Sequence, residues 1–118
     1  MARILVVDDE ADIRELLGIF LKGEGYEVTA ASIGSEALAK IRVQSPDLVL
    51  LDVKLEKESG VELLQKIREE NQHLKVIMVS GCDEEDYWPQ AEKLGALGHA
   101  AKPFDLIALN DLLKKALG

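Results

Sequence analysis

Apolar residues follow two patterns along the chain, and segments with one pattern alternate with segments with the other. Unbroken apolar runs, typical of strands buried on both faces of a sheet, are separated by stretches in which apolar residues recur every three or four positions, as on an amphipathic helix. One short segment instead alternates apolar and polar residues, which favours an edge strand. The pattern predicts strands at residues 3–7, 26–30, 48–51, 75–79 and about 97–101.

Turn residues and helical spacing place five helices between and after these strands. The first helix is expected to end at Gly23–Gly25, and Ser35 is expected to cap the second, which ends before Pro46. Pro89 is acceptable in the first turn of a short fourth helix that stops at Gly95. The apolar positions that mark the other helices fall within 13–21, 37–41, 61–67 and 106–117.

This alternation of strand and helix indicates the α/β fold class. Crossovers between parallel strands are right-handed, so a (βα)5 repeat predicts a doubly wound parallel sheet between two layers of helices, with the flavodoxin-like strand order 2-1-3-4-5. We expect residues 1–118 to form this single domain. In such sheets, ligands bind outside the carboxyl ends of the strands.

Functional groups stand at the carboxyl ends of four predicted strands. Asp8 and Asp9 follow the first strand, Asp52 the third, Ser80 the fourth and Lys102 the fifth. Because parallel strands end at the same edge of a sheet, we expect these side chains to converge. Three carboxylates repel one another unless a cation shares their site, and Mg²⁺ prefers carboxylates, water and phosphate oxygens. The pattern predicts a divalent-metal site for phosphoryl transfer.

Asp52 is the best-placed nucleophile, since it stands alone at the end of the most apolar strand, and an aspartyl carboxylate that attacks phosphorus forms an acyl phosphate. Lys102 and Ser80 would contact phosphoryl oxygens as ammonium and hydroxyl donors. Each motif also has an ordinary structural interpretation. The aspartate pair could cap a helix, Asp52 and Ser80 could begin turns, and Lys102 could lie in a loop. The prediction therefore rests on all four motifs occurring in this order.

Composition limits the remaining possibilities. The net charge of −8 at pH 7 argues against a nucleic-acid-binding surface, which would be basic. No apolar run approaches the roughly 18 residues that a membrane span needs, and the N-terminus lacks the pattern of a signal peptide. The single cysteine, Cys82, excludes an intramolecular disulfide and fits a reducing compartment. We expect a cytoplasmic domain that contacts neither nucleic acid nor membrane.

Four segments carry a resemblance to a known family: Ile4–Glu10, Asp47–Asp52, Ser59–Leu64 and Lys102–Phe104. Together they resemble the receiver domain of two-component response regulators, of the single-domain chemotaxis type, and the likeness covers essentially the whole chain. The resemblance implies that Asp52 is phosphorylated by a sensor histidine kinase or a histidine phosphotransfer protein. It also implies a signalling switch that assists its own phosphorylation and dephosphorylation, not a conventional enzyme.

The resemblance further implies a set of metal ligands. Asp9 and Asp52 would bind Mg²⁺ or Mn²⁺ directly, with Asp8 acting largely through water and the backbone carbonyl of Lys54 as a third protein ligand. A cis Lys102–Pro103 peptide bond would aim the lysine into the site.

In this family the hydroxyl at the Ser80 position moves towards the phosphate, and an aromatic residue on the fifth strand follows. The matching residue is His99, which could instead be a half-exposed strand residue. The switch would reshape the face of the fourth helix, fifth strand and fifth helix for a downstream protein, with the domain a monomer or a phosphorylation-dependent dimer. Asp83–Asp86 favours a helix start, and the adjacent Tyr87–Trp88 could anchor a partner or pack in the core.

Two departures from the family pattern leave the output open. Glu56 stands where a proline is usual, and Lys54 could be solvated or could contact phosphate.

A small phosphohydrolase with an aspartyl nucleophile would carry an acid at the Lys54 position. A phosphorylation-independent interaction module should have lost some of Asp52, Ser80 and Lys102. The cognate kinase, the output and whether the domain belongs to a longer regulator stay open.

Overall fold

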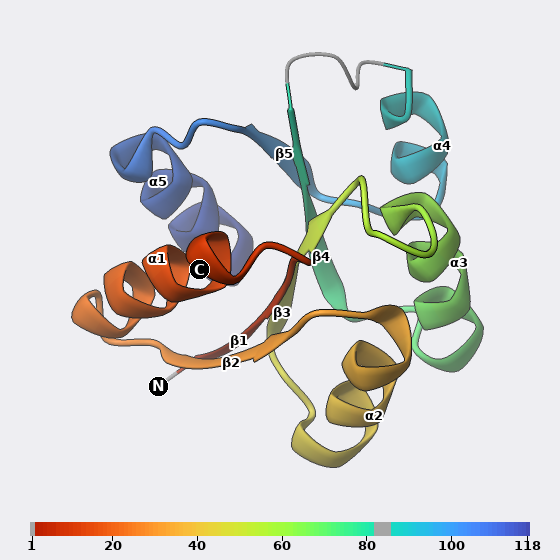
Figure 1. The fold of residues 1–118 in the computed structure, drawn as a ribbon, viewed down its shortest axis with the longest axis horizontal. Helices are drawn as coiled ribbons and strands as arrows, with labels where there is room; N and C mark the ends of the chain where they lie inside the picture. Colours follow the sequence, from red (N-terminus) through yellow and green to blue (C-terminus); the bar gives the residue numbers. More distant parts are fainter. Residues whose placement is uncertain (1, 82–85) are drawn as a thin grey trace.

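The computed structural model describes residues 2–81 and 86–118, so Cys82 and most of the acidic segment 83–86 lie outside the described residues. No helix in the described ranges has both the length and the apolar character that crossing a bilayer requires. Strands and helices alternate along the chain (Figure 1), in the order β1 (Arg3–Val7), α1 (Ala11–Gly23), β2 (Glu27–Ala31), α2 (Gly34–Gln44), β3 (Leu48–Asp52), α3 (Gly60–Glu70), β4 (Lys75–Ser80), α4 (Trp88–Lys93), β5 (Gly98–Ala101) and α5 (Leu106–Leu117).

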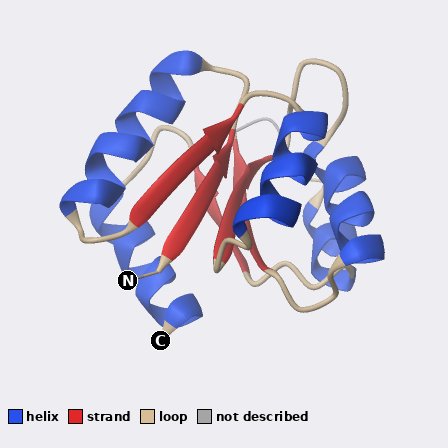
Figure 2. Ribbon diagram, turned by 90° about the horizontal axis from the view of Figure 1, so that it is seen from below, coloured by secondary structure: helices blue, strands red, loops and turns tan. Residues whose placement is uncertain are grey.

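The strands form one parallel sheet in the order β2-β1-β3-β4-β5, which confirms the predicted flavodoxin-like topology. Helices α1 and α5 cover one face of the sheet, and α2, α3 and α4 cover the other (Figures 1 and 2). The chain runs outward from β1 to β2 and then returns to β3 on the other side of β1. This reversal creates a crevice at the carboxyl ends of β1 and β3, where ligands bind in such folds.

Packing on both faces of the central strand β3 holds its last residue, Asp52, in place. Leu48 and Leu50 pack into the core under α1 and α5, whereas Val49 and Leu51 pack into the core under α2, α3 and α4. All four are fully buried, and burying a side chain of this size stabilises the fold by about 1.5–3 kcal/mol. Asp52 is therefore anchored at the carboxyl edge by apolar packing on both faces.

The start of α2 differs from the prediction. The N-cap residue is Ile33, and Ser35 lies inside the helix, so the expected Ser35 cap is wrong. The physical reason is a competing side chain: the Glu36 carboxylate accepts a hydrogen bond from the backbone N–H of Ser32 at 2.7 Å and so stabilises the chain just before the helix. Helices α3 and α5 do begin with side-chain caps, from Ser59 and Asp105.

Candidate functional site

The predicted site residues lie at one edge of the sheet. Asp52 and Ser80 are the last residues of β3 and β4, and Asp8 and Lys102 directly follow β1 and β5. Asp8, Asp52 and Ser80 are all buried. Burying polar groups costs free energy unless they find partners. Three buried polar side chains at one edge of the sheet therefore indicate a functional site.

Lys102 joins two of the carboxylates. Its Nζ atom lies 2.9 Å from Asp8 Oδ2 and 3.1 Å from Asp52 Oδ2. The side chain of Lys102 is 18% exposed, and those of Asp8 and Asp52 are 3% and 5% exposed, so this contact is shielded from solvent. The arrangement matches the convergence predicted from the strand ends. Lys102 does lie in the loop after β5, as its ordinary interpretation allowed, but its ammonium contacts the two acids.

The electrostatics of Asp52 reflect burial beside another acid. Burial and the charge of Asp8 raise the pKa of Asp52 from its ordinary value of 3.8 to about 6, against the lowering effect of hydrogen bonds from the Lys54 backbone and from Lys102. Burial opposes the charge of Lys102, but its hydrogen bonds to Asp8 and Asp52 and their charges outweigh this effect and raise its pKa. The cation is therefore held charged between two acids.

The loop after β3 is fixed by backbone contacts. Asp52 Oδ1 accepts a hydrogen bond from the N–H of Lys54 at 3.2 Å, and the N–H of Gly60 donates to the carbonyl of Val53 at 2.6 Å. Gly60 is needed there because a Cβ atom at this position would overlap the carbonyl oxygen of Asp52 and lie 2.9 Å from Val53 Cα. The side chain of Lys54 is exposed beside this loop.

The acidic residues after β1 form a candidate cation site. One carboxylate oxygen each from Asp8, Asp9 and Glu10 lies within 4.8 Å of the others, and carboxylates are the donors that Mg²⁺ and Mn²⁺ prefer. Asp8 Oδ1 also accepts the backbone N–H of Glu10 at 2.8 Å. The N-cap of α1 is Glu10, without a side-chain cap hydrogen bond, so the alternative in which the aspartate pair caps the helix is wrong. The sequence interpretation did not single out Glu10.

Ser80 lies against α4. Its hydroxyl oxygen accepts a hydrogen bond from Tyr87 Oη at 3.3 Å, and its backbone carbonyl accepts the N–H of Lys102 at 2.8 Å. The Trp88 ring makes edge contacts with Tyr87 and His99, with centroids 6.3 and 5.0 Å apart. Tyr87 and Trp88 pack, partly buried, against the apolar core, and His99 is exposed. The Tyr87–Ser80 contact was not predicted.

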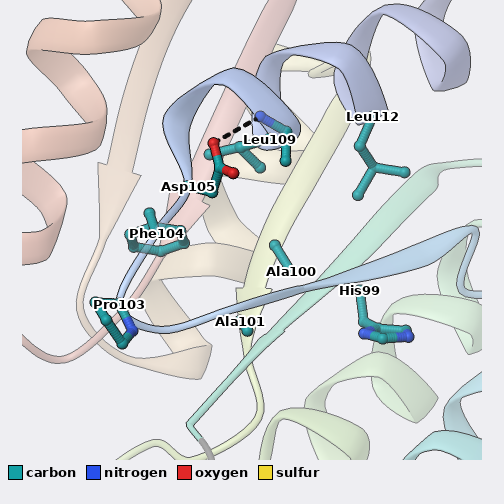
Figure 3. A pocket seen from close by; sticks show the side chains of 9 residues that line it. His99, Ala100, Ala101, Pro103, Phe104, Asp105, Leu109 and Leu112 are labelled. Carbon is teal, nitrogen blue, oxygen red and sulfur yellow. Dashed lines mark hydrogen bonds between the residues drawn. The ribbon is translucent and has the colours of Figure 1, made fainter.

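Residues 103–105, after Lys102, connect β5 to α5. The Lys102–Pro103 peptide bond is cis. Figure 3 shows Pro103 and Phe104 leading into α5, whose first turn is capped by the Asp105 carboxylate, which accepts the N–H of Ala108 at 3.1 Å. This stretch lines a hollow of about 280 Å³ together with His99 and Leu112. The hollow lies on the β5–α5 surface, and neither Asp8 nor Asp52 lines it.

Comparison with known proteins agrees with the geometry. The family model of the response regulator receiver domain matches residues 4–114. Sporulation initiation phosphotransferase F of Bacillus subtilis is 39% identical over 115 residues, which cover 98% of this chain and 93% of that protein. The alkaline phosphatase synthesis transcriptional regulatory protein PhoP of the same organism is also 39% identical, but the chain covers 48% of its length.

Solved structures give the same picture. The chemotaxis protein CheY4 of Vibrio cholerae superimposes with a TM-score of 0.93 at 30% identity, with 99% of each chain covered. The receiver domain of NtrX from Brucella abortus gives a TM-score of 0.91 at 38% identity, with 97% of each chain covered. The chain thus spans nearly all of some relatives and about half, or less, of others.

Proposed function

This chain belongs to the response regulator receiver domain family, and on that premise we propose that it is a phosphorylation-activated switch whose phosphoryl acceptor is Asp52. The donor is a phosphohistidine on a sensor histidine kinase or a histidine phosphotransfer protein. The observation that supports this proposal best is the buried contact of Lys102 with both Asp8 and Asp52. In this contact, the nucleophile Asp52 has the ammonium of Lys102 as a fixed cation beside it.

In the proposed reaction an Asp52 carboxylate oxygen attacks phosphorus, the phosphorus–nitrogen bond of phosphohistidine breaks, and the imidazole nitrogen leaves with a proton from solvent. Lys102 then pairs with the phosphoryl oxygens, and the Ser80 hydroxyl donates a hydrogen bond to one of them. The backbone N–H of Lys54 holds the acceptor carboxylate in place during attack. Catalysis of this kind consists of positioning and charge stabilisation.

A divalent cation completes the proposed site. We assign Mg²⁺ or Mn²⁺ to Asp8, Asp9, Asp52 and the backbone carbonyl of Lys54. When bound, the ion supplies positive charge that offsets the charge on the phosphoryl oxygens. The fit is supported by the donor set, since the carboxylates after β1 approach one another closely and the single ammonium of Lys102 faces two acids.

The output of the switch is binding of a downstream protein by the face of α4, β5 and α5, as a monomer or a phosphorylation-dependent dimer. We further propose that residues 1–118 act as one domain in the cytoplasm, where the kinase domain would meet it. His99 on β5 belongs to this face and changes its packing when Ser80 moves.

Intact mass spectrometry tests the proposal. The protein is incubated with Mg²⁺ and acetyl phosphate, and we expect one phosphoryl group to be added. The Asp52→Ala variant should gain none, whereas Asp111→Ala, which changes an exposed aspartate on α5, should gain the same adduct as the wild type. An adduct that persists in Asp52→Ala, or one that forms equally after chelation of the metal, contradicts the proposal.

A further inference from the structure

Ser80 is held by a residue to which the proposed reaction gives no role. Its Oγ atom accepts a hydrogen bond from Tyr87 Oη at 3.3 Å, and Ser80 is buried. Among the described residues, no hydrogen bond joins Ser80 Oγ to Asp52 or to Lys102 Nζ. We propose that Tyr87 is a positioning residue that retains Ser80 in its unphosphorylated arrangement and competes with the phosphoryl group for it.

The competition follows from the geometry of a serine side chain. Oγ occupies one of three staggered positions about the Cα–Cβ bond. The position seen here brings it to Tyr87, at the start of α4, whereas the phosphoryl group would stand on Asp52 at the end of β3. Accepting from Tyr87 leaves the Ser80 hydrogen free to donate, so the proposed competition is for the position of Oγ: donation to a group on Asp52 would draw Oγ towards β3 and lengthen the contact with Tyr87.

Tyr87 is well placed to resist this movement. It is the N-cap residue of α4, and its carbonyl oxygen accepts the N–H of Ala91 at 3.1 Å. Pro89 lies within the first turn and restricts the backbone that follows. The ring is partly buried against the apolar core. The phenol is therefore presented to Ser80 from a constrained backbone.

Two ring contacts extend this link to the surface. Tyr87 meets Trp88 edge-on at 6.3 Å between centroids, and Trp88 meets His99 at 5.0 Å. Because Trp88 is the only tryptophan in the chain, its emission reports on this contact without labelling. Loss of the Ser80–Tyr87 bond is expected to alter the packing of Trp88.

The inference rests on the proposed function, since it needs a phosphoryl group on Asp52. A contact made only in the unphosphorylated state stabilises that state, so its removal shifts the population towards the other. Removing one neutral hydrogen bond is expected to tighten binding of a phosphoryl mimic by roughly 2- to 10-fold. Tyr87→Phe is the suitable change because it deletes the hydroxyl and keeps the ring.

The experiment measures binding of beryllium fluoride, in the presence of Mg²⁺, through Trp88 emission and calorimetry. We expect Tyr87→Phe to bind it more tightly than the wild type, and Tyr26→Phe, which removes the other tyrosine hydroxyl of the chain, to leave the affinity unchanged. A role in core packing alone would not tighten binding. Thermal melting checks that both variants are folded.

A double-mutant cycle assigns the effect to Ser80. In a Ser80→Ala background, the added Tyr87→Phe change should leave the affinity for beryllium fluoride unaltered, because the bond is already absent. Equal affinity of Tyr87→Phe and wild type, or the same tightening in the Ser80→Ala background, overturns this inference while leaving the proposed function intact. Absence of any beryllium fluoride complex with the wild type overturns both.

Discussion

Lys102 Nζ lies 3.1 Å from Asp52 Oδ2, so the acceptor carboxylate of the proposed reaction has a partly buried counter-ion before any phosphate arrives. The same ammonium lies 2.9 Å from Asp8. One cation therefore faces two acids, and the excess negative charge favours a second cation. In the proposed reaction, phosphorylation would add negative charge and acceptor oxygens at Asp52, and these oxygens would give Lys102 a new partner.

Replacing this lysine should separate phosphorylation from switching. We expect Lys102→Met to gain a phosphoryl group in the presence of Mg²⁺ but to show no change in Trp88 emission, because the ammonium that pairs with the phosphoryl oxygens is missing. Two buried carboxylates lose their partner, so the free energy of unfolding without Mg²⁺ should fall by about 3 kcal/mol. Mass spectrometry and urea denaturation measure the two effects.

Lys115→Met is the matched control, since Lys115 is exposed on α5. It should keep the adduct, the emission change and the stability of the wild type. A full emission change in phosphorylated Lys102→Met would refute the role of the lysine in the switch.

The raised pKa of Asp52 makes stability depend on pH. Its folded-state pKa of about 6 lies above the ordinary value of 3.8, so the folded state holds this proton more tightly than the unfolded state does. The corresponding stabilisation is fully present below pH 3.8 and is lost as the pH rises to about 6. Without Mg²⁺, Asp52→Asn should therefore be more stable than the wild type above pH 6 by about 3 kcal/mol.

Urea denaturation across this range checks the prediction. The curves of Asp52→Asn and wild type should converge as the pH falls towards 4, and added Mg²⁺ should reduce the gain by stabilising the wild type. Asp111→Asn, at an exposed position, should show no pH-dependent difference. An equal gain at all pH values would mean that the ionisation of Asp52 is not its cause.

Replacing single acids tests which of them hold the ion in the proposed metal site. Asp9→Ala should weaken Mg²⁺ binding by about 1–3 kcal/mol, the scale of losing a hydrogen-bonding contact to a charged group, measured by calorimetry. Asp12→Ala, on the exposed part of α1, should have no effect. Because Glu10 lies within reach of Asp8 and Asp9, a loss in Glu10→Ala as large as that in Asp9→Ala would indicate an ion held by these three acids, contrary to the ligand set that includes Asp52.

The fold and the main site residues were predictable for a physical reason. Parallel strands share one direction, so residues at their carboxyl ends meet at one edge whatever separates them in sequence. Asp8, Asp52 and Lys102 come together on this ground alone. The two-sided burial of β3 is equally local in origin, since an unbroken apolar run leaves no face for solvent.

What the sequence did not predict depends on the path of loops and on competition between side chains. The Tyr87–Ser80 contact is set by where the chain enters α4, and no periodicity encodes it. The start of α2 was misplaced because Glu36 reaches back to Ser32 and removes the need for a cap at Ser35.

Gly60 offers a last test of how the loop after β3 supports the acceptor. A methyl group at Gly60 would overlap the carbonyl oxygen of Asp52, so Gly60→Ala must displace the backbone at the site. We expect a loss of about 1–3 kcal/mol in unfolding free energy and slower phosphorylation by acetyl phosphate. Gly18→Ala is the control, because no atom lies within 4 Å of the added Cβ and alanine favours a helix by about 1 kcal/mol. It should be more stable and be phosphorylated at the wild-type rate. Normal phosphorylation of Gly60→Ala would show that the loop tolerates the displacement and does not position Asp52.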